Sequence, residues 1–240
     1  MIRAVTFDLW NTLLCERFYS DYRIGLLVHA LDEEGFPRDR HRVEVEYSST
    51  IDFFYEVWMK ERRHIPATKL MKFILNRLDV HLPAEIKNRL VKNFEEAILK
   101  DPPPLVRDAR KVLESLHGLY IIGLVSNSGV TPGRVLRQVL DDQKVLQYFS
   151  CTMFSDEVGY HKPHPTIFRK AIKELNVKAN DTIHIGDLLE PDVAGAKAVG
   201  MKTVWFNATE RNNQTHESEF APDHEIRALS QLPGILERKK

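Results

Sequence analysis

Cysteine is scarce in this sequence, and long apolar runs are missing from it. The chain of 240 residues has two cysteines, Cys15 and Cys151, whose spacing matches neither a CxxC pair nor a metal-binding pattern. We therefore expect free thiols in a reducing compartment and no disulfide framework. No apolar run reaches the roughly 18 residues that a membrane-spanning helix needs. These absences predict a cytoplasmic protein with no membrane partner.

An excess of one charge is lacking as well. The sequence has 34 Lys and Arg against 34 Asp and Glu, which gives a formal net charge of zero at pH 7. Proteins that bind nucleic acids usually carry a basic excess or a basic stripe, so we expect no nucleic-acid partner. The chain also has no GxGxxG or Walker-type loop, which excludes the common fingerprints for dinucleotides and nucleoside triphosphates.

Short apolar runs alternate with helical patterns over most of the chain. The apolar runs predict buried strands at Ala4–Leu9, Ile121–Ser126, Cys151–Ser155, Thr182–Ile185 and Lys202–Phe206. The helical patterns cover Val106–Leu116, Gly133–Leu140, Pro165–Leu175 and Pro191–Val199. A polar, turn-rich stretch at residues 207–223 precedes a short strand and a last helix within residues 224–236. This alternation predicts an α/β fold with a doubly wound, Rossmann-like parallel sheet that helices cover on both faces.

The region between the first two predicted strands has no strand pattern. Its apolar residues recur at helical spacing, as in "ATKLMKFILNRL" at residues 67–78 and "PAEIKNRLVKNFEEAIL" at residues 83–99. We therefore predict an all-helical domain at residues 17–100. The Rossmann-like core is then formed by residues 1–16 and 101–240 together.

Polar side chains follow four of the predicted strands. They are Asp8, Ser126 with Asn127, Lys162, and Asp187 with Asp192. In an open parallel sheet, ligands bind outside the carboxyl ends of the strands, so these groups can converge on one place. Clustered carboxylates repel one another unless a cation lies between them, and Mg²⁺ prefers oxygen ligands together with a substrate phosphate. A lysine and a serine hydroxyl beside them suit an anion, and a carboxylate can attack phosphorus as a nucleophile.

The order and spacing of these residues resemble the four signature motifs of the haloacid dehalogenase superfamily, most of whose members are phosphatases. The resemblance rests on "FDLWNTLL", "GLVSNSG", "SDEVGYHKPHPTIF" and "HIGDLLEPDVAGAKAVGM" and extends over nearly the whole chain. It implies a hydrolase whose helical insert is a mobile cap over the site. The implied substrate is a small phosphate ester, and the chain would be a monomer or a homodimer.

The resemblance also implies a role for each motif residue. Asp8 would be the nucleophile, and Lys162 would neutralise both the nucleophile and the transferring group. Ser126, Asn127 and Thr12 would bind the phosphoryl group or support the loop that holds it. The Mg²⁺ ligands would be Asp8, the backbone carbonyl of Trp10 and Asp187, with Asp192 as a direct or water-mediated partner.

Trp10 departs from the pattern of the usual phosphatases. In those enzymes a second aspartate two residues after the nucleophile serves as general acid and base, whereas an indole has no titratable proton near neutral pH. Three alternatives remain open: a phosphatase with another proton donor, a metal-independent 2-haloacid dehalogenase, and a weakly active binding or regulatory module. The 2-haloacid dehalogenases of this superfamily also lack that aspartate, and they need no metal. In this chain, however, Asp187 and Asp192 favour a cation.

Other residues are candidates for contact with substrate. Tyr19, Tyr22 and Arg23 follow the first motif, near the predicted junction of core and cap. The charged run around Trp58, "YEVWMKERRH", is more typical of a solvated helix face.

Overall fold

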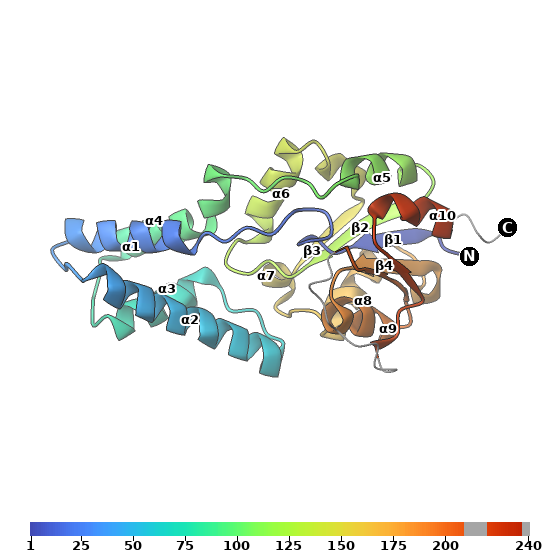
Figure 1. The fold of residues 1–240 in the computed structure, drawn as a ribbon. Helices are drawn as coiled ribbons and strands as arrows, with labels where there is room; N and C mark the ends of the chain where they lie inside the picture. Colours follow the sequence, from blue (N-terminus) through green and yellow to red (C-terminus); the bar gives the residue numbers. More distant parts are fainter. Residues whose placement is uncertain (209–219, 237–240) are drawn as a thin grey trace.

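The computed structural model describes residues 1–208 and 220–236, and it contains one parallel sheet flanked by helices (Figure 1). The six strands are β1 (Ala4–Phe7), β2 (Ile121–Ser126), β3 (Cys151–Phe154), β4 (Thr182–Gly186), β5 (Lys202–Phe206) and β6 (His224–Ile226). They lie in the order β3-β2-β1-β4-β5-β6, and every neighbouring pair is parallel. The predicted Rossmann-like α/β fold is confirmed.

The first strand lies in the middle of the sheet, and this explains its unbroken apolar character. All four residues of β1 are buried, because helices cover both faces of the sheet. Phe7 is in register with Leu124 of β2 on one side and with Ile185 of β4 on the other. The residues that follow these three strands therefore leave the same edge of the sheet at the same level.

Two groups of helices cover the sheet. The first comprises α5 (Ala109–Leu116), α6 (Gly133–Asp142) and α10 (Leu232–Leu236), which pack with β1, β2, β4 and β5 in the largest hydrophobic cluster. The second comprises α8 (Pro165–Glu174) and α9 (Gly195–Lys197), which pack against Val125 of β2. Figure 1 shows the two groups on opposite sides of the strands.

Short elements connect these helices and strands. They are the helix α7 (Ser155–Val158), the π-helix η4 (Leu189–Ala194) and the 3₁₀ helices η1 (Ala97–Lys100), η2 (Leu146–Tyr148), η3 (Ala179–Asp181) and η6 (Leu229–Gln231). The predicted helix at Pro191–Val199 is therefore a π-helix followed by the short α9. The helix predicted from Val106 begins at Ala109, because Asp108 has a positive φ of 64°. Most of the polar stretch at 207–223 lies outside the described residues.

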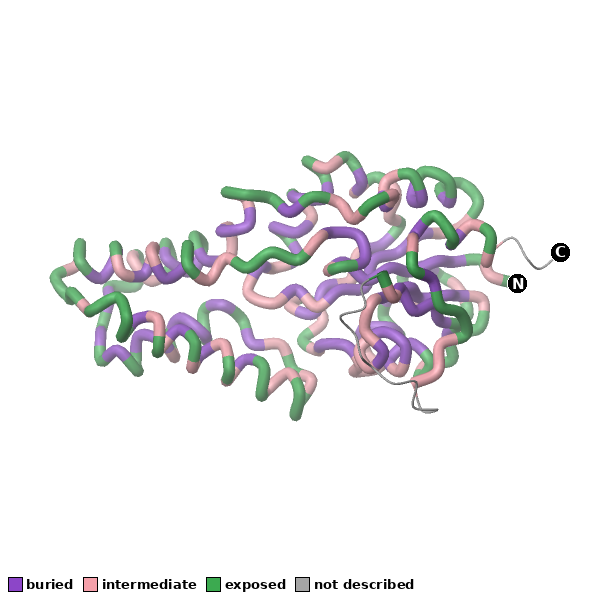
Figure 2. The backbone as a smooth tube through the Cα atoms, in the orientation of Figure 1, coloured by how far each residue is buried: buried purple, intermediate pink, exposed green. Residues whose placement is uncertain are grey.

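Four of the five α-helices between β1 and β2 form a second body beside the sheet (Figure 1). They are α1 (Ser20–Glu33), α2 (Arg40–Glu61), α3 (Ala67–Arg77) and α4 (Ala84–Glu95), called the helical insert below. They share a hydrophobic cluster that includes Leu27, Tyr47, Ile74 and Phe94. Figure 2 shows buried residues in each of the four helices, with exposed residues on their outer sides. Among the described residues, no helix is both long and apolar enough to cross a bilayer.

We predict that Leu27→Ala destabilises the helical insert by about 2–5 kcal/mol, because Leu27 is fully buried and truncation leaves a cavity. Chemical denaturation followed by circular dichroism measures the loss. Leu119→Ala is the control, since Leu119 is 72% exposed, and it should change the unfolding free energy by less than about 0.5 kcal/mol. Equal effects of the two substitutions would contradict a separate core in the insert.

Candidate active site

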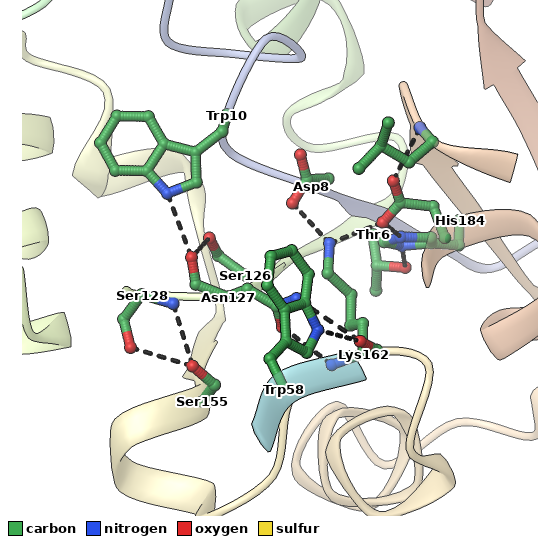
Figure 3. Close-up of polar contacts among 12 residues, drawn as sticks. Thr6, Asp8, Trp10, Trp58, Ser126, Asn127, Ser128, Ser155, Lys162 and His184 are labelled. Carbon is green, nitrogen blue, oxygen red and sulfur yellow. Dashed lines mark hydrogen bonds and ion pairs between the residues drawn. The ribbon is translucent and has the colours of Figure 1, made fainter. Parts of the chain in front are cut away.

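A buried lysine joins two carboxylates at the carboxyl edge of the sheet (Figure 3). The Nζ of Lys162 lies 2.5 Å from Oδ1 of Asp8 and 2.6 Å from Oδ1 of Asp192. Lys162 is 2% exposed, Asp8 5% and Asp192 1%, so water screens these ion pairs poorly. Although burial opposes it, Asp192 and Asp8 raise the pKa of Lys162, which therefore stays charged.

Asp192 has further hydrogen bonds that fix its orientation. Its Oδ1 lies 3.2 Å from Nε2 of His184, and its Oδ2 accepts a hydrogen bond of 3.1 Å from the backbone N–H of Leu188. Nδ1 of the same imidazole lies 2.9 Å from the Thr6 hydroxyl. Burial lowers the pKa of His184, so the ring is neutral and donates through Nε2. Lys162 and His184 lower the pKa of Asp192 to about 2, against the effect of burial.

Gly186 lets Asp192 approach the end of β4. A Cβ atom on Gly186 would lie 2.2 Å from Cγ of Asp192, well inside van der Waals contact. Any side chain at this position would displace the carboxylate that holds Lys162. The close backbone approach is therefore the reason for a glycine here.

Asp187 completes a group of three carboxylates. Single oxygens of Asp8, Asp187 and Asp192 all lie within 4.8 Å of one another. Burial, and then the nearby charges of Asp8 and Asp192, raise the pKa of Asp187 to about 8. Burial also raises the pKa of Asp8 to about 6, despite the opposing charge of Lys162. Three carboxylates beside the ammonium of Lys162 give this group a net charge of −2 when all are ionised.

The oxygen atoms of these three carboxylates suit Mg²⁺ as ligands. Ligands on opposite sides of a Mg²⁺ ion bound at about 2.1 Å are about 4.2 Å apart, close to the observed spread of the three carboxylates. The carbonyl of Trp10 accepts no hydrogen bond from the described residues, so it is available as another hard oxygen ligand. Of the predicted metal ligands, the structure brings Asp8, Asp187 and Asp192 together. The oxygens of Asp192 already accept hydrogen bonds, which agrees with a water-mediated contact between Asp192 and the metal.

The indole of Trp10 ties the first loop to the second. Its Nε1 donates a hydrogen bond of 3.1 Å to the carbonyl of Asn127 (Figure 3). The side chain of Asn127 in turn holds the backbone of Lys162: its Oδ1 accepts from the Lys162 N–H at 2.8 Å, and its Nδ2 lies 3.5 Å from the Lys162 carbonyl. Oδ1 and Nδ2 of Asn127 therefore both contact the backbone of Lys162. Only the main chain around Asn127 is then left to contact a ligand.

Two predicted hydroxyl groups lie in buried loops. Ser126 is fully buried at the end of β2, with its Oγ 3.4 Å from the Asn127 carbonyl. Thr12 is fully buried too, and its hydroxyl has no hydrogen-bond partner among the described residues. The loop after Ser126 is held by Ser128, whose N–H and hydroxyl both lie 3.0 Å from Oγ of Ser155.

The end of α2 reaches the loop that carries Lys162. Nε1 of Trp58 donates a hydrogen bond of 3.1 Å to the Lys162 carbonyl, and Arg62 pairs with Glu190 at 2.5 Å. This charged run is thus in contact with the core rather than fully solvated. His184 and Thr6 are the polar partners that sequence patterns missed. The only available signal was a histidine inside the otherwise apolar run of β4.

Comparisons with known proteins identify the family of the chain. The sequence profile of the haloacid dehalogenase-like hydrolases matches residues 2–200. The chain is 31% identical to glyceraldehyde 3-phosphate phosphatase of Pyrococcus abyssi, over all of this chain and 95% of that protein. Among solved structures, a HAD phosphatase from Thermococcus onnurineus has a TM-score of 0.66 at 26% identity, covering 98% of each chain. A 2-haloacid dehalogenase from Pseudomonas syringae has a TM-score of 0.74 at 24% identity, covering 99% of each, which shows a shared fold.

The structure combines a parallel α/β sheet with a buried lysine and a carboxylate cluster at the sheet's carboxyl edge. The chain belongs to the haloacid dehalogenase-like hydrolases. The predicted family and the predicted hydrolase activity class are confirmed.

We predict that the thermal stability of the metal-free protein falls as the pH rises from about 4 to about 8. The pKa of Asp187 is raised from 3.8 to about 8, so the folded state retains a proton that the unfolded state has already lost in this range. Mg²⁺ should raise the melting temperature, and more at pH 8 than near pH 5.5, because binding displaces this proton. Differential scanning fluorimetry with Mg²⁺ or EDTA measures both effects.

Asp187→Asn should weaken both the pH dependence and the Mg²⁺ effect. Asp142→Asn, an exposed position at the end of α6, is the matched control and should behave as the unchanged protein. A Mg²⁺ shift of equal size in the Asp187 variant would exclude this carboxylate as a ligand.

Proposed function

We propose that this protein is a Mg²⁺-dependent phosphatase that hydrolyses a small phosphate ester through an aspartyl-phosphate on Asp8. The observation that carries the proposal is the carboxylate cluster beside Lys162, in which oxygens of Asp8, Asp187 and Asp192 lie within 4.8 Å of one another, a spacing that suits a divalent cation. The phosphatase names of the Pyrococcus abyssi relative and the Thermococcus onnurineus structure support phosphoric monoester hydrolysis. The former's substrate, glyceraldehyde 3-phosphate, is of the size class that we propose.

The first step is an in-line attack on phosphorus. A carboxylate oxygen of Asp8 forms a bond to phosphorus, and the ester P–O bond breaks with its electron pair on the leaving oxygen. Lys162 offsets the charge of Asp8 and of the transferring group, while Ser126 and the main chain at Asn127 hold the phosphoryl oxygens. A bound Mg²⁺ would neutralise the carboxylates and polarise the phosphoryl group.

The second step regenerates Asp8. Water attacks the phosphorus of the acyl phosphate, the bond to the Asp8 oxygen breaks, and inorganic phosphate leaves. His184 keeps Asp192 in place, and Asp192 keeps Lys162 beside the reacting carboxylate throughout. Trp10 contributes its backbone carbonyl and its hydrogen bond to Asn127, but no proton. The leaving oxygen therefore takes its proton from water or from another group in the site.

The helical insert serves as the cap in this proposal. Residues of the insert and of the core together line a cavity beside Trp10, so the site lies where the two bodies meet. Contacts of Trp58 and Arg62 with the core hold the insert over the lysine loop. Exclusion of water from such a site strengthens its electrostatic interactions.

A dehalogenase reaction is the second candidate, because Trp10 replaces the general acid and the dehalogenase fold is closely similar. The two activities predict opposite assay results. We expect phosphate release from a panel of phosphate esters only with Mg²⁺, and no chloride release from 2-chloropropionate. Asp8→Asn should lower phosphate release by at least about 10³-fold, and Asp142→Asn should not change it. Chloride release without metal would establish the dehalogenase instead. Failure of both reactions would favour a binding module.

We predict that the rate depends strongly on the leaving group. Without an aspartate at position 10, aryl phosphates with acidic phenols should react faster than alkyl phosphates, since a general acid is worth about 10²–10⁴ in rate. Steady-state kinetics over a series of aryl phosphates measures the slope of log kcat/KM against the leaving-group pKa.

Trp10→Asp should flatten this slope, whereas Trp10→Phe should leave it steep. Both variants lose the hydrogen bond to the Asn127 carbonyl, so their comparison isolates the carboxyl group from the loss of that contact. A flat slope in the unchanged enzyme, with chemistry as the slow step in a pre-steady-state measurement, would show that another acid is present.

A further inference from the structure

Two long cationic side chains are buried in the described part of the chain, and only one of them has a carboxylate partner. Lys162 lies between Asp8 and Asp192. Arg23, in the first turn of α1, is 8% exposed, and no carboxylate among residues 1–208 and 220–236 lies within ion-pair distance of it. Burying a charge without a counter-charge is costly, so the guanidinium of Arg23 calls for an anion.

The hydrogen bonds of Arg23 leave much of its donor capacity unused. Nε donates to the Phe94 carbonyl at 3.0 Å, and Nη2 donates to the Thr131 hydroxyl at 3.2 Å. The guanidinium carbon also lies 5.9 Å from the centre of the Tyr19 ring. An arginine has five N–H donors, and the remaining three have no acceptor among the described residues. These contacts orient the planar group without neutralising it.

Arg23 lines a cavity at the junction of the helical insert and the core. The cavity has a volume of about 160 Å³. Its walls include Tyr19 and Phe54 from the insert side and Trp10 and Ser128 from the core. Trp10 belongs to the loop of Asp8, and Ser128 follows the phosphate-binding loop at Ser126. The cavity is therefore where the part of the substrate that is not transferred would lie.

The charges that face this cavity favour an anion. Besides Arg23, its charged lining residues are Arg17 and Glu16. Glu16 is exposed, and its carboxylate accepts a hydrogen bond from the Asn11 amide, while Arg17 pairs with Asp101. Arg23 alone is both buried and unpaired. The aromatic walls lower the local polarity and strengthen its attraction for a negative group.

We propose that Arg23 binds a carboxylate at the far end of the substrate, so that the enzyme prefers phosphate esters of small hydroxy acids. This inference rests on the proposed phosphatase function and specifies its substrate class. The planar fork of a guanidinium matches a carboxylate with two parallel hydrogen bonds, which a neutral hydroxyl or aldehyde cannot accept. A cavity of about 150 Å³ holds a benzene molecule, so this one suits an acid of three or four carbons.

Three phosphate esters with the same number of carbons test the proposal. They are 3-phosphoglycerate, which has a carboxylate, and glyceraldehyde 3-phosphate and glycerol 3-phosphate, whose far ends are neutral. With Mg²⁺ present, the unchanged enzyme should have a kcat/KM for 3-phosphoglycerate about 10- to 100-fold above those for the neutral esters, as for a charge-assisted hydrogen bond.

Arg23→Gln should abolish this preference by lowering kcat/KM for 3-phosphoglycerate alone, and Arg23→Lys should retain part of it. Arg38→Gln is the matched control: Arg38 also lies in the insert and also donates to main-chain carbonyls, at Leu78 and Asp79, but does not line the cavity. It should leave the preference unchanged.

A purely structural role of Arg23 predicts equal losses with all three esters, and that result would overturn the inference while leaving the phosphatase function intact. The absence of any preference for the carboxylate in the unchanged enzyme would overturn it too. If none of the phosphate esters in the panel were hydrolysed, the proposed function itself would fail, and the inference with it.

Discussion

The two ion pairs of Lys162 are the interaction on which the rest of the site depends. A lysine that is 2% exposed remains charged only because Asp8 and Asp192 lie within 2.6 Å of it. Removing both carboxylates would leave the ammonium of Lys162 buried without either ion pair, which is far more costly than the loss of a surface pair. The hydrogen bonds and packing contacts of the surrounding loops and strands hold Lys162 and its two carboxylate partners in position.

Those contacts come from several separate segments of the chain. The amide of Asn127 holds the lysine backbone, His184 and the close approach at Gly186 hold Asp192, and the indole of Trp10 holds the Asn127 carbonyl. The contacts of Asn127 and Trp10 join segments that follow different strands, whereas the contacts of Asp192 join β4 to the segment directly after it. The parallel register of β1, β2 and β4 brings them to one level, so the geometry of the sheet determines the geometry of the site.

Sequence patterns predicted the architecture well because strands buried on both faces need apolar runs. The same runs ended at Asp8, Ser126 and Asp187, so the convergence of these groups could be expected before the structure was known. The hydrogen bonds of Trp10 and Arg23 could not, since their partners are 117 and 108 residues away along the chain. The burial of Arg23 without a carboxylate partner arises only when the chain has folded, so the spacing of residues in the sequence cannot predict it.

The contact between α2 and the lysine loop has a consequence for the timing of the reaction. The Trp58 indole donates to the carbonyl of Lys162 itself, and the neighbouring Arg62 pairs with Glu190 in η4, close to Asp192. A movement of the insert away from the core would break both contacts, together with the backbone hydrogen bonds that join Arg62 to His161 and His64 to Gly159. If the insert moves as the proposed cap, its opening would loosen the main chain at Lys162 and its closing would restrain that main chain again, so access and the position of the lysine depend on the same contacts.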